Sequence, residues 1–343
     1  MGIEAFIAAL PKAELHVHLV GAASVDTVLE LSRRHPTSKV PKEPSELARY
    51  YEFTDFPHFI NVYSAVNKLV TTPEDVQTML LGLARDLAAN NVRYAEVTVS
   101  AIAHFPCGIS PDTLSEALVA GRSQALAEHD VELAWIFDVP MPSDRRDGYS
   151  TLEYVLDQRP EGTVGFGLAG LEAPYPRAGF KASFQDAIAA GLHSVPHAGE
   201  TTGPEEIWAA LRDLGAERIG HAVSAVQDEK LLKCLADTGV PVEVSLTSNI
   251  RTRAVPSLAE HPLPRLLDAG VTVTLNTDDP GMFGTDLNRE YLLCHEVFGL
   301  GRAELAELAR NAARAAFCSE QTRTRLLDGI DAVEEADRRD LRA

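Results

Sequence analysis

The sequence predicts an α/β fold of the (β/α)8 type, a TIM barrel, with a helical insertion after the first strand. Three observations support this prediction. Eight short apolar, β-prone runs recur along the 343 residues, with helical patterns between them. Most runs are continuously apolar, as expected of parallel strands that helices cover on both faces. Four of them end in motifs that carry histidine or aspartate, and such barrels place their active sites at the carboxyl ends of the strands.

The eight predicted strands are short and follow one another along the whole chain. They span 14–19, 92–100, 131–139, 163–170, 193–200, 218–223, 241–249 and 271–279. The helical pattern is clearest just before the second strand. There Thr72 is suited to be the N-cap, Pro73 to take the first helical position and Asp75 to complete a capping box. The apolar residues that follow lie on one helical face.

One connection is much longer than the rest, because the first strand ends near Leu19 and the second begins near Val92. Residues 20–91 are therefore predicted to form several helices on the catalytic face, as a lid that excludes water. The insertion carries six aromatic residues: Tyr50, Tyr51, Phe53, Phe56, Phe59 and Tyr63. We expect most of them to pack in the insertion's own small core and one or two to face the substrate.

The chain is expected to form one domain, 1–343, because no linker, repeat or low-complexity tract divides it. Its last part, 321–343, is predicted to be a helical tail. From Asp328 onward the density of Asp, Glu and Arg indicates a solvated helix.

Composition excludes several classes of protein. The 31 basic and 50 acidic residues give a net charge of −19, which disfavours nucleic acid as a partner and favours solubility. The four cysteines lack CxxC spacing, so neither a disulfide framework nor a thiolate zinc site is indicated. The amino terminus does not resemble a signal peptide, and no stretch has the length of a membrane span. We expect a cytoplasmic enzyme that acts on a small molecule and does not bind membranes. Its oligomeric state stays open, with a homodimer as one option.

Four residues form a candidate site for one metal ion per chain. His16 and His18 lie two apart on a predicted strand, so both imidazoles point to the same face. His197 at the end of strand five can add a third nitrogen, and Asp278 at the end of strand eight an oxygen. Histidine and carboxylate ligands without cysteine suit Zn2+ or another first-row ion such as Fe(II).

Three further motif residues are candidate acid–base groups. Glu200 lies beyond the end of strand five and can face the substrate, and His221 ends strand six. Asp279 directly follows Asp278, so its side chain should diverge towards the substrate. A metal-activated water needs a group that orients it and an acid that protonates the substrate, and we assign these roles to His221 and Glu200. The residues alone leave open whether the attacked carbon belongs to an amide, an ester or an aminopurine.

The motifs together resemble the adenosine deaminase family of the amidohydrolase superfamily. The resemblance covers about residues 8–320. It is carried by 11–22 (PKAELHVHLVGA), 167–170 (GLAG), 197–200 (HAGE), 220–222 (GHA), 245–249 (SLTSN) and 275–280 (LNTDDP). It implies hydrolytic removal of the 6-amino group of an adenine base.

The resemblance also implies a role for each motif residue. Zinc would sit on His16, His18, His197 and Asp278. Glu200 would donate a proton to purine N1, and His221 would orient the attacking water. Asp279 would face N7, and the backbone of Gly170 would meet N3.

The sequence departs from the family pattern around the ribose. Adenosine deaminases have an acid after the HxHL segment, where it meets the 5′-hydroxyl, but this chain has Val20. Two more acids of the pattern are replaced by Gly167 and Leu171. Burying an unpaired 5′-hydroxyl against Val20 would cost about 1–3 kcal/mol, so plain adenosine should be a poor substrate.

These departures favour a nucleoside with an apolar 5′ extension that packs against Val20. The family includes deaminases of 6-amino-6-deoxyfutalosine, an intermediate of menaquinone biosynthesis with a carboxyphenyl ketone on its 5′ side. Its carboxylate would need a cation near the mouth of the site. The candidates are Arg145, Arg146, Arg177, Arg251 and Arg253, all on loops predicted at the catalytic face, with Arg145 and Arg177 assigned to substrate binding.

Other functions stay open at this point. Adenosine, adenine and methylthioadenosine are alternative substrates, and the last tolerates Val20 without needing an arginine. A metal-dependent hydrolase of a non-purine substrate would also use an HxH pair. Two-metal barrels of that kind usually need a lysine at the end of strand four, where this chain has Gly170. An inactive metal-binding module would have lost Glu200 or His221, and both are present. His104 receives no role.

Overall fold

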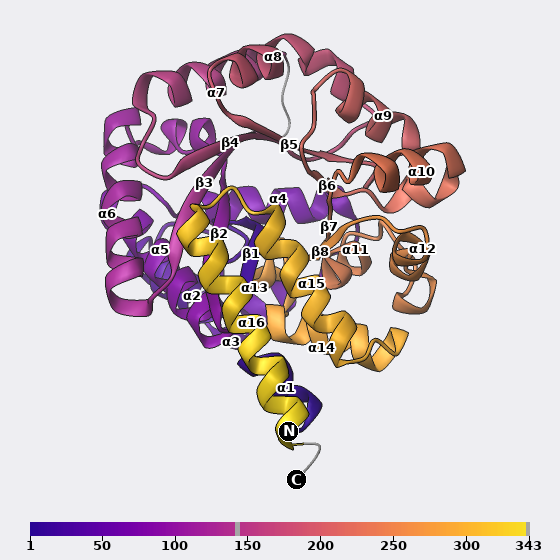
Figure 1. Cartoon of the computed structure of the whole chain (residues 1–343). Coiled ribbons are helices and arrows are strands. Elements are labelled where there is room, and N and C mark those ends of the chain that lie inside the picture. The colour runs from indigo at the N-terminus through magenta and orange to yellow at the C-terminus, as the bar shows by residue number, and fades with distance from the viewer. Residues whose placement is uncertain (141–144, 341–343) are drawn as a thin grey trace.

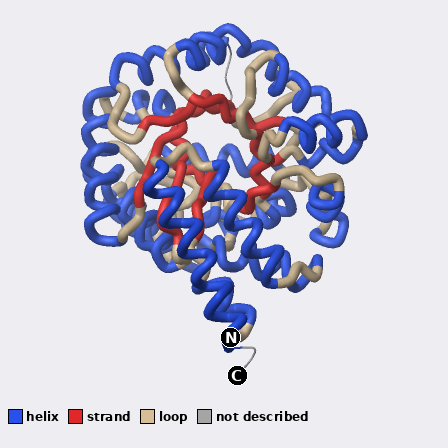
Figure 2. The backbone as a smooth tube through the Cα atoms, viewed as in Figure 1, coloured by secondary structure: helices blue, strands red, loops and turns tan. Residues whose placement is uncertain are grey.

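The computed structural model describes residues 1–140 and 145–340, without the side chain of Arg145. Eight parallel strands pair in the order β1 to β8 and form a nearly closed barrel inside a ring of helices (Figures 1 and 2). This confirms the predicted fold. The strands are β1 (Lys12–His18), β2 (Val92–Val99), β3 (Glu132–Val139), β4 (Thr163–Leu168), β5 (His193–Ala198), β6 (Ile219–His221), β7 (Val242–Val244) and β8 (Val273–Leu275).

The helices fall into three groups. Those before β1 and in the insertion are α1 (Ile3–Ala9), α2 (Val25–Arg34), α3 (Pro44–Tyr50), α4 (Phe56–Asn67) and α5 (Pro73–Ala89). Those between later strands are α6 (Pro111–His129), α7 (Arg145–Gln158), α8 (Lys181–Ala189), α9 (Pro204–Arg212), α10 (Glu229–Thr238), α11 (Leu246–Arg251) and α12 (Leu263–Asp268). After β8 come α13 (Pro280–Phe283), α14 (Leu287–Phe298), α15 (Arg302–Ala315) and α16 (Glu320–Asp340).

Local signals placed several boundaries well. Helix α5 begins after the Thr72 N-cap, and the reciprocal capping box with Asp75 is present. The last strands are shorter than predicted, however. Residues 245–249 are not part of β7, because α11 begins at Leu246. Only the apolar stretch Val242–Val244 pairs with its neighbours, whereas the polar residues after it turn their side chains to the site.

The barrel closes through the backbone of a candidate metal ligand. Val17 of β1 forms a parallel bridge with Asp278, which lies beyond the end of β8. The amide of His18 donates to the carbonyl of Asp278 at 2.9 Å, and the amide of Asp278 donates to the carbonyl of His16 at 2.9 Å. Closure of the barrel therefore fixes residues from the first and last strands next to one another.

The amino-terminal end of the barrel is covered by α15 and α16, which cross the front of Figure 1. A small apolar cluster lies beneath them and includes Ala13, Leu15, Tyr94, Ala312 and Leu326. Helix α16 begins at Glu320 and buries Leu326 and Ile330, so the tail is not simply a solvated helix. Within the described ranges, no helix is both long and apolar enough to cross a membrane.

Candidate active site

Three imidazoles and one carboxylate converge at the carboxyl end of the barrel. One possible ligand atom from each of His16, His18, His197 and Asp278 lies within 4.8 Å of the others, and all four residues are buried. His18 Nε2 is 3.1 Å from His197 Nε2 and 3.2 Å from Asp278 Oδ1. His16 Nε2 has no hydrogen-bond partner although it is buried. An inward-facing orphan nitrogen in a set of three nitrogens and one oxygen fits a divalent metal ion such as zinc.

The backbone around this cluster is strained. His221, Ala222 and Asp278 all have positive φ angles, at 63°, 51° and 67°. Left-handed backbone is unfavourable for such residues and tends to persist where the surrounding structure holds a functional geometry. Gly220 leaves room for the cluster, because a Cβ there would come within 2.8 Å of His16 Cε1.

Neighbouring groups orient His16 and favour the ionised form of Asp278. Glu243 accepts from His16 Nδ1 at 2.9 Å, which turns His16 Nε2 towards the cluster. Burial alone would raise the pKa of Asp278, but the neighbouring imidazoles, above all His16 with its Nε2 at 3.4 Å from Asp278 Oδ1, outweigh it and hold this pKa well below its usual range. Ser248 Oγ also donates to Asp278 Oδ2 at 2.5 Å.

Glu200, His221 and Asp279 lie beside the four candidate ligands. His221 Nε2 is 3.7 Å from Glu200 Oε2 and 4.0 Å from Asp278 Oδ2. Burial, and after it the charge of Asp278, raises the pKa of Glu200 to about 8. Burial and the same neighbouring charge raise the pKa of Asp279 well above its usual value. A carboxyl group whose pKa is raised in this way can keep a proton and donate a hydrogen bond to a substrate.

A buried carboxylate that sequence reasoning missed shapes the loop after β5. Glu172 accepts hydrogen bonds from the amides of Gly199, Glu200 and Thr201 at 2.8–3.0 Å. Its position two residues after the GLAG motif was the only signal in the sequence.

Arg177, which we assigned to substrate binding, does not reach the cavity. It is fully buried and does not line the cavity described below. Its guanidinium donates to the carbonyl oxygens of His197 at 2.7 Å and Gly170 at 2.9 Å. A buried cation needs acceptors on all sides, and here the ends of β4 and β5 provide them. Arg177 thus ties two elements of the site together.

A cavity of about 270 Å³ opens directly above the cluster. Its inner end is formed by site residues, namely His18, Gly170, His197, Glu200, His221, Asp278 and Asp279. The insertion forms its wall through Phe56, Phe59 and Tyr63 of α4, one aromatic residue more than expected. The lining also includes Asp138 and Ser100, whose Oγ donates to Asp138 Oδ1 at 2.7 Å. Burial raises the pKa of Asp138.

Lys68 is the only lysine or arginine among the described residues that line the cavity. It follows α4, and the neighbouring Asn67 Nδ2 donates to the carbonyl of Ala103 at 3.1 Å. This bond ties the end of α4 to the loop after β2, where Pro106 and Cys107 also line the cavity. The prediction looked for a cation only in loops that follow strands, so it missed a lysine at the end of a lid helix.

The predicted arginines lie elsewhere. Arg251 donates from Nη2 to the carbonyl of Tyr51 at 2.6 Å, so it holds the insertion against the barrel. Arg146 in α7 and the exposed Arg253 do not line the cavity. The side chain of Arg145 lies outside the described residues, so its assignment stays a prediction. His104, without a predicted role, is buried and is not part of the cavity wall.

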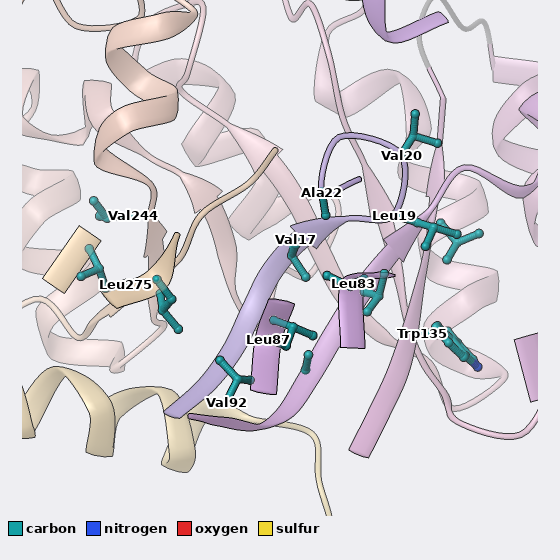
Figure 3. Close-up of a cluster of buried hydrophobic side chains, with 14 of the residues drawn as sticks. Val17, Leu19, Val20, Ala22, Leu83, Leu87, Val92, Trp135, Val244 and Leu275 are labelled. Atoms are coloured by element: carbon teal, nitrogen blue, oxygen red, sulfur yellow. The ribbon is translucent and has the colours of Figure 1, made fainter. Parts of the chain in front are cut away.

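Val20 also departs from its predicted place. It is buried in the main apolar core and is drawn there in Figure 3 beside Leu19 and Ala22. It is not among the residues that line the cavity. The contact that the sequence suggested between Val20 and a 5′ extension is therefore not supported by the position of this side chain.

A parallel barrel with one histidine–carboxylate cluster, a buried carboxyl group of raised pKa and a buried imidazole at its carboxyl end is the arrangement of a metal-dependent hydrolase. Residues 11–333 match the family model described as adenosine deaminase. The chain belongs to the adenosine deaminase family and is a metal-dependent deaminase.

Known relatives cover nearly the whole chain. The aminodeoxyfutalosine deaminase of Streptomyces coelicolor is 50% identical over 331 residues, which are 96% of this chain and 86% of that protein. The adenine deaminase of Arthrobacter aurescens superposes with a TM-score of 0.90 at 30% identity, covering 95% of this chain and 99% of that one. A cog1816 amidohydrolase of Burkholderia ambifaria with bound Zn has a TM-score of 0.88 at 26% identity, covering 97% and 94%.

Proposed function

We propose that this enzyme converts 6-amino-6-deoxyfutalosine to futalosine and ammonia, as a step of menaquinone biosynthesis. The observation that carries the proposal is the cavity, whose lining combines the candidate metal ligands, apolar side chains of α4 and the exposed lysine Lys68. These three kinds of surface suit a molecule that contains an adenine, an aryl group and a carboxylate. The 50% identity to the Streptomyces coelicolor enzyme supports the same substrate.

We assign one metal ion per chain to His16, His18, His197 and Asp278, and the zinc in the Burkholderia ambifaria protein favours zinc. When bound, such an ion lowers the pKa of a water molecule to about 7 and so provides a nucleophile at neutral pH.

The purine is held by groups that complement its ring nitrogens. Protonated Glu200 faces N1 and protonated Asp279 faces N7, because each ring nitrogen carries a lone pair and needs a donor. The oxygen of water bonds to C6 while N1 takes the proton of Glu200. The C6–N6 bond then breaks, and ammonia leaves with the proton of the new C6 hydroxyl group. The other proton of the water returns to Glu200.

Polar side chains in the cavity lining suit the ribose. Asp138, which already accepts a hydrogen bond from Ser100 Oγ at 2.7 Å, offers further acceptor positions to the sugar hydroxyls. Phe56, Phe59 and Pro106 give the aryl group an apolar surface, and Lys68 lies beside Cys107. The cytoplasmic location is part of the proposal, and the four free cysteines support it. A homodimer stays a prediction.

The deciding experiment compares kcat/KM for 6-amino-6-deoxyfutalosine, methylthioadenosine, adenosine and adenine, followed by the loss of adenine absorbance. We expect the first to be strongly preferred. Equal or better turnover of adenosine would contradict the proposed function.

A second measurement tests the tail contact. Lys68→Met should lower kcat/KM for 6-amino-6-deoxyfutalosine about tenfold, equal to about 1.4 kcal/mol, through a higher KM. Turnover of methylthioadenosine should not change, since its thioether is uncharged. Lys39→Met is the matched control, because Lys39 is an exposed lysine of the same insertion outside the cavity. An equal loss on both substrates would show that Lys68 does not recognise the carboxylate.

A further inference from the structure

A chain of hydrogen bonds runs from the backbone of α12 to the imidazole of His221. The amide of Leu263 donates to His261 Nδ1 at 3.0 Å. His261 Nε2 is 3.1 Å from Asn249 Oδ1, and Asn249 Nδ2 is 3.1 Å from His221 Nδ1. All three side chains are buried, with exposed fractions of 4% or less. Neither His261 nor Asn249 lines the cavity, so neither touches a substrate there.

The first hydrogen bond determines which atom is the donor and which the acceptor in the other two. A backbone amide can only donate, so His261 Nδ1 must accept and cannot carry a proton. The single ring proton of His261 is then on Nε2, and it is donated to the side-chain oxygen of Asn249. The amide of Asn249 must in turn present its NH2 group to His221. His221 Nδ1 therefore accepts, which excludes the doubly protonated imidazolium and places the one ring proton on Nε2.

We propose that His261 and Asn249 are positioning residues that hold His221 in the Nε2–H tautomer. The atom that faces Glu200 and Asp278 is then a hydrogen-bond donor. In this state His221 can orient the attacking oxygen and stabilise negative charge on it, but it cannot remove a proton from water. Burial, which lowers the pKa of His261 to about 4, agrees with a neutral ring at the start of these hydrogen bonds.

This inference concerns the deaminase reaction and does not depend on which adenine nucleoside is the substrate. A different tautomer of His221 would leave the proposed substrate untouched, and a different substrate would leave the tautomer untouched. It also gives a role to Asn249, the last residue of the SLTSN motif, which the proposed reaction did not use.

The direct test is 15N NMR of histidine-labelled protein, both metal-free and zinc-loaded. Loss of one signal pair in His221→Asn identifies His221 among the eleven histidines. We expect its proton on Nε2 in both states. A proton on Nδ1 in the wild-type protein would overturn the proposal without the need for any further variant.

A substitution of nearly the same shape should then reverse which ring nitrogen of His221 carries the proton. In Asn249→Asp, a carboxylate would accept from both imidazoles and pull the proton of His221 to Nδ1. We expect the 15N signals of His221 to show the proton on Nδ1 instead of Nε2. We also expect kcat to fall about 10²–10³-fold, as for the loss of one preorganised donor, with KM changed far less. Unchanged kcat, or unchanged protonation of His221, would contradict the proposal.

Two histidine variants provide the controls. His261→Gln keeps an N–H donor for Asn249 and should retain the Nε2–H tautomer and most of kcat, whereas His261→Leu should lose both. His295→Gln should change neither, because this partly buried histidine, whose Nδ1 is 2.9 Å from the carbonyl oxygen of Leu300, lies outside these hydrogen bonds. Equal losses in His261→Gln and His261→Leu would indicate a packing role alone.

Discussion

The two ends of the barrel bury charged side chains in opposite ways. At the amino-terminal end, the ammonium of Lys12 donates to three carbonyl oxygens at 2.6–3.1 Å. The guanidinium of Arg218 pairs with Glu96 and Glu243, and also donates to the carbonyl of Ala315. At the carboxyl end, buried polar atoms such as His16 Nε2, His197 Nδ1 and Asp279 Oδ1 have no partner.

Glu243 connects the two ends. One of its oxygens accepts from Arg218 at 2.6 Å and the other from His16 at 2.9 Å. Buried polar groups without a partner lower the free energy of unfolding. At the carboxyl end, binding of metal and substrate would offset this loss. Lys12 and Arg218 thus contribute to the stability of the fold through their hydrogen bonds, whereas the unpaired polar atoms of the site are free to bind metal and substrate.

The largest effect is expected when the carboxyl end loses its carboxylate ligand. Asp278→Ala should reduce the metal content from about one ion per chain to near zero and lower kcat by more than about 10⁴-fold. A chelator should inactivate the wild-type protein equally, and zinc should restore the wild type but not the variant. Metal analysis and turnover check this; a variant that keeps its metal would remove Asp278 from the ligand set.

The next effect concerns the proton donor. Glu200→Gln should keep the metal but lower kcat/KM by about 10²–10⁴-fold, because the amide cannot protonate N1. Since the pKa of Glu200 is about 8, the carboxyl is protonated at neutral pH and loses its proton as the pH rises. The kcat/KM of the wild type should therefore fall above about pH 8, as a pH profile would show. A rate that stays flat well beyond this pH would contradict the assigned role.

The amino-terminal end should respond in stability. Arg218→Met leaves two buried carboxylates without their cation and should lower the free energy of unfolding by about 3–5 kcal/mol, measured by urea denaturation. Arg265→Met breaks an exposed pair with Glu229 and should cost less than about 1 kcal/mol. Similar losses in the two variants would show that the two ends do not differ as described.

Much of the site was visible in the sequence because each motif ends a strand. A parallel barrel aligns the carboxyl ends of its strands, so His16, His18, His197 and Asp278 could be placed together without coordinates. The capping box of Thr72 and Asp75 was equally readable, since it depends on residues three apart. A basic residue that could bind the substrate carboxylate was harder to predict. Arg177 follows β4 and Lys68 follows α4, and only packing decides that Arg177 is buried while Lys68 lines the cavity.

Strand periodicity and short motifs are local properties of the chain, so the sequence was enough to predict the barrel and to propose the metal ligands and the acid–base residues. Packing was needed to show that Val20 lies in the core, that Arg177 joins the ends of β4 and β5 and that Lys68 lines the cavity. It alone brought His261 into line with Asn249 and His221. These are contacts between segments far apart in the sequence, and their geometry depends on how helices and loops pack around the closed barrel.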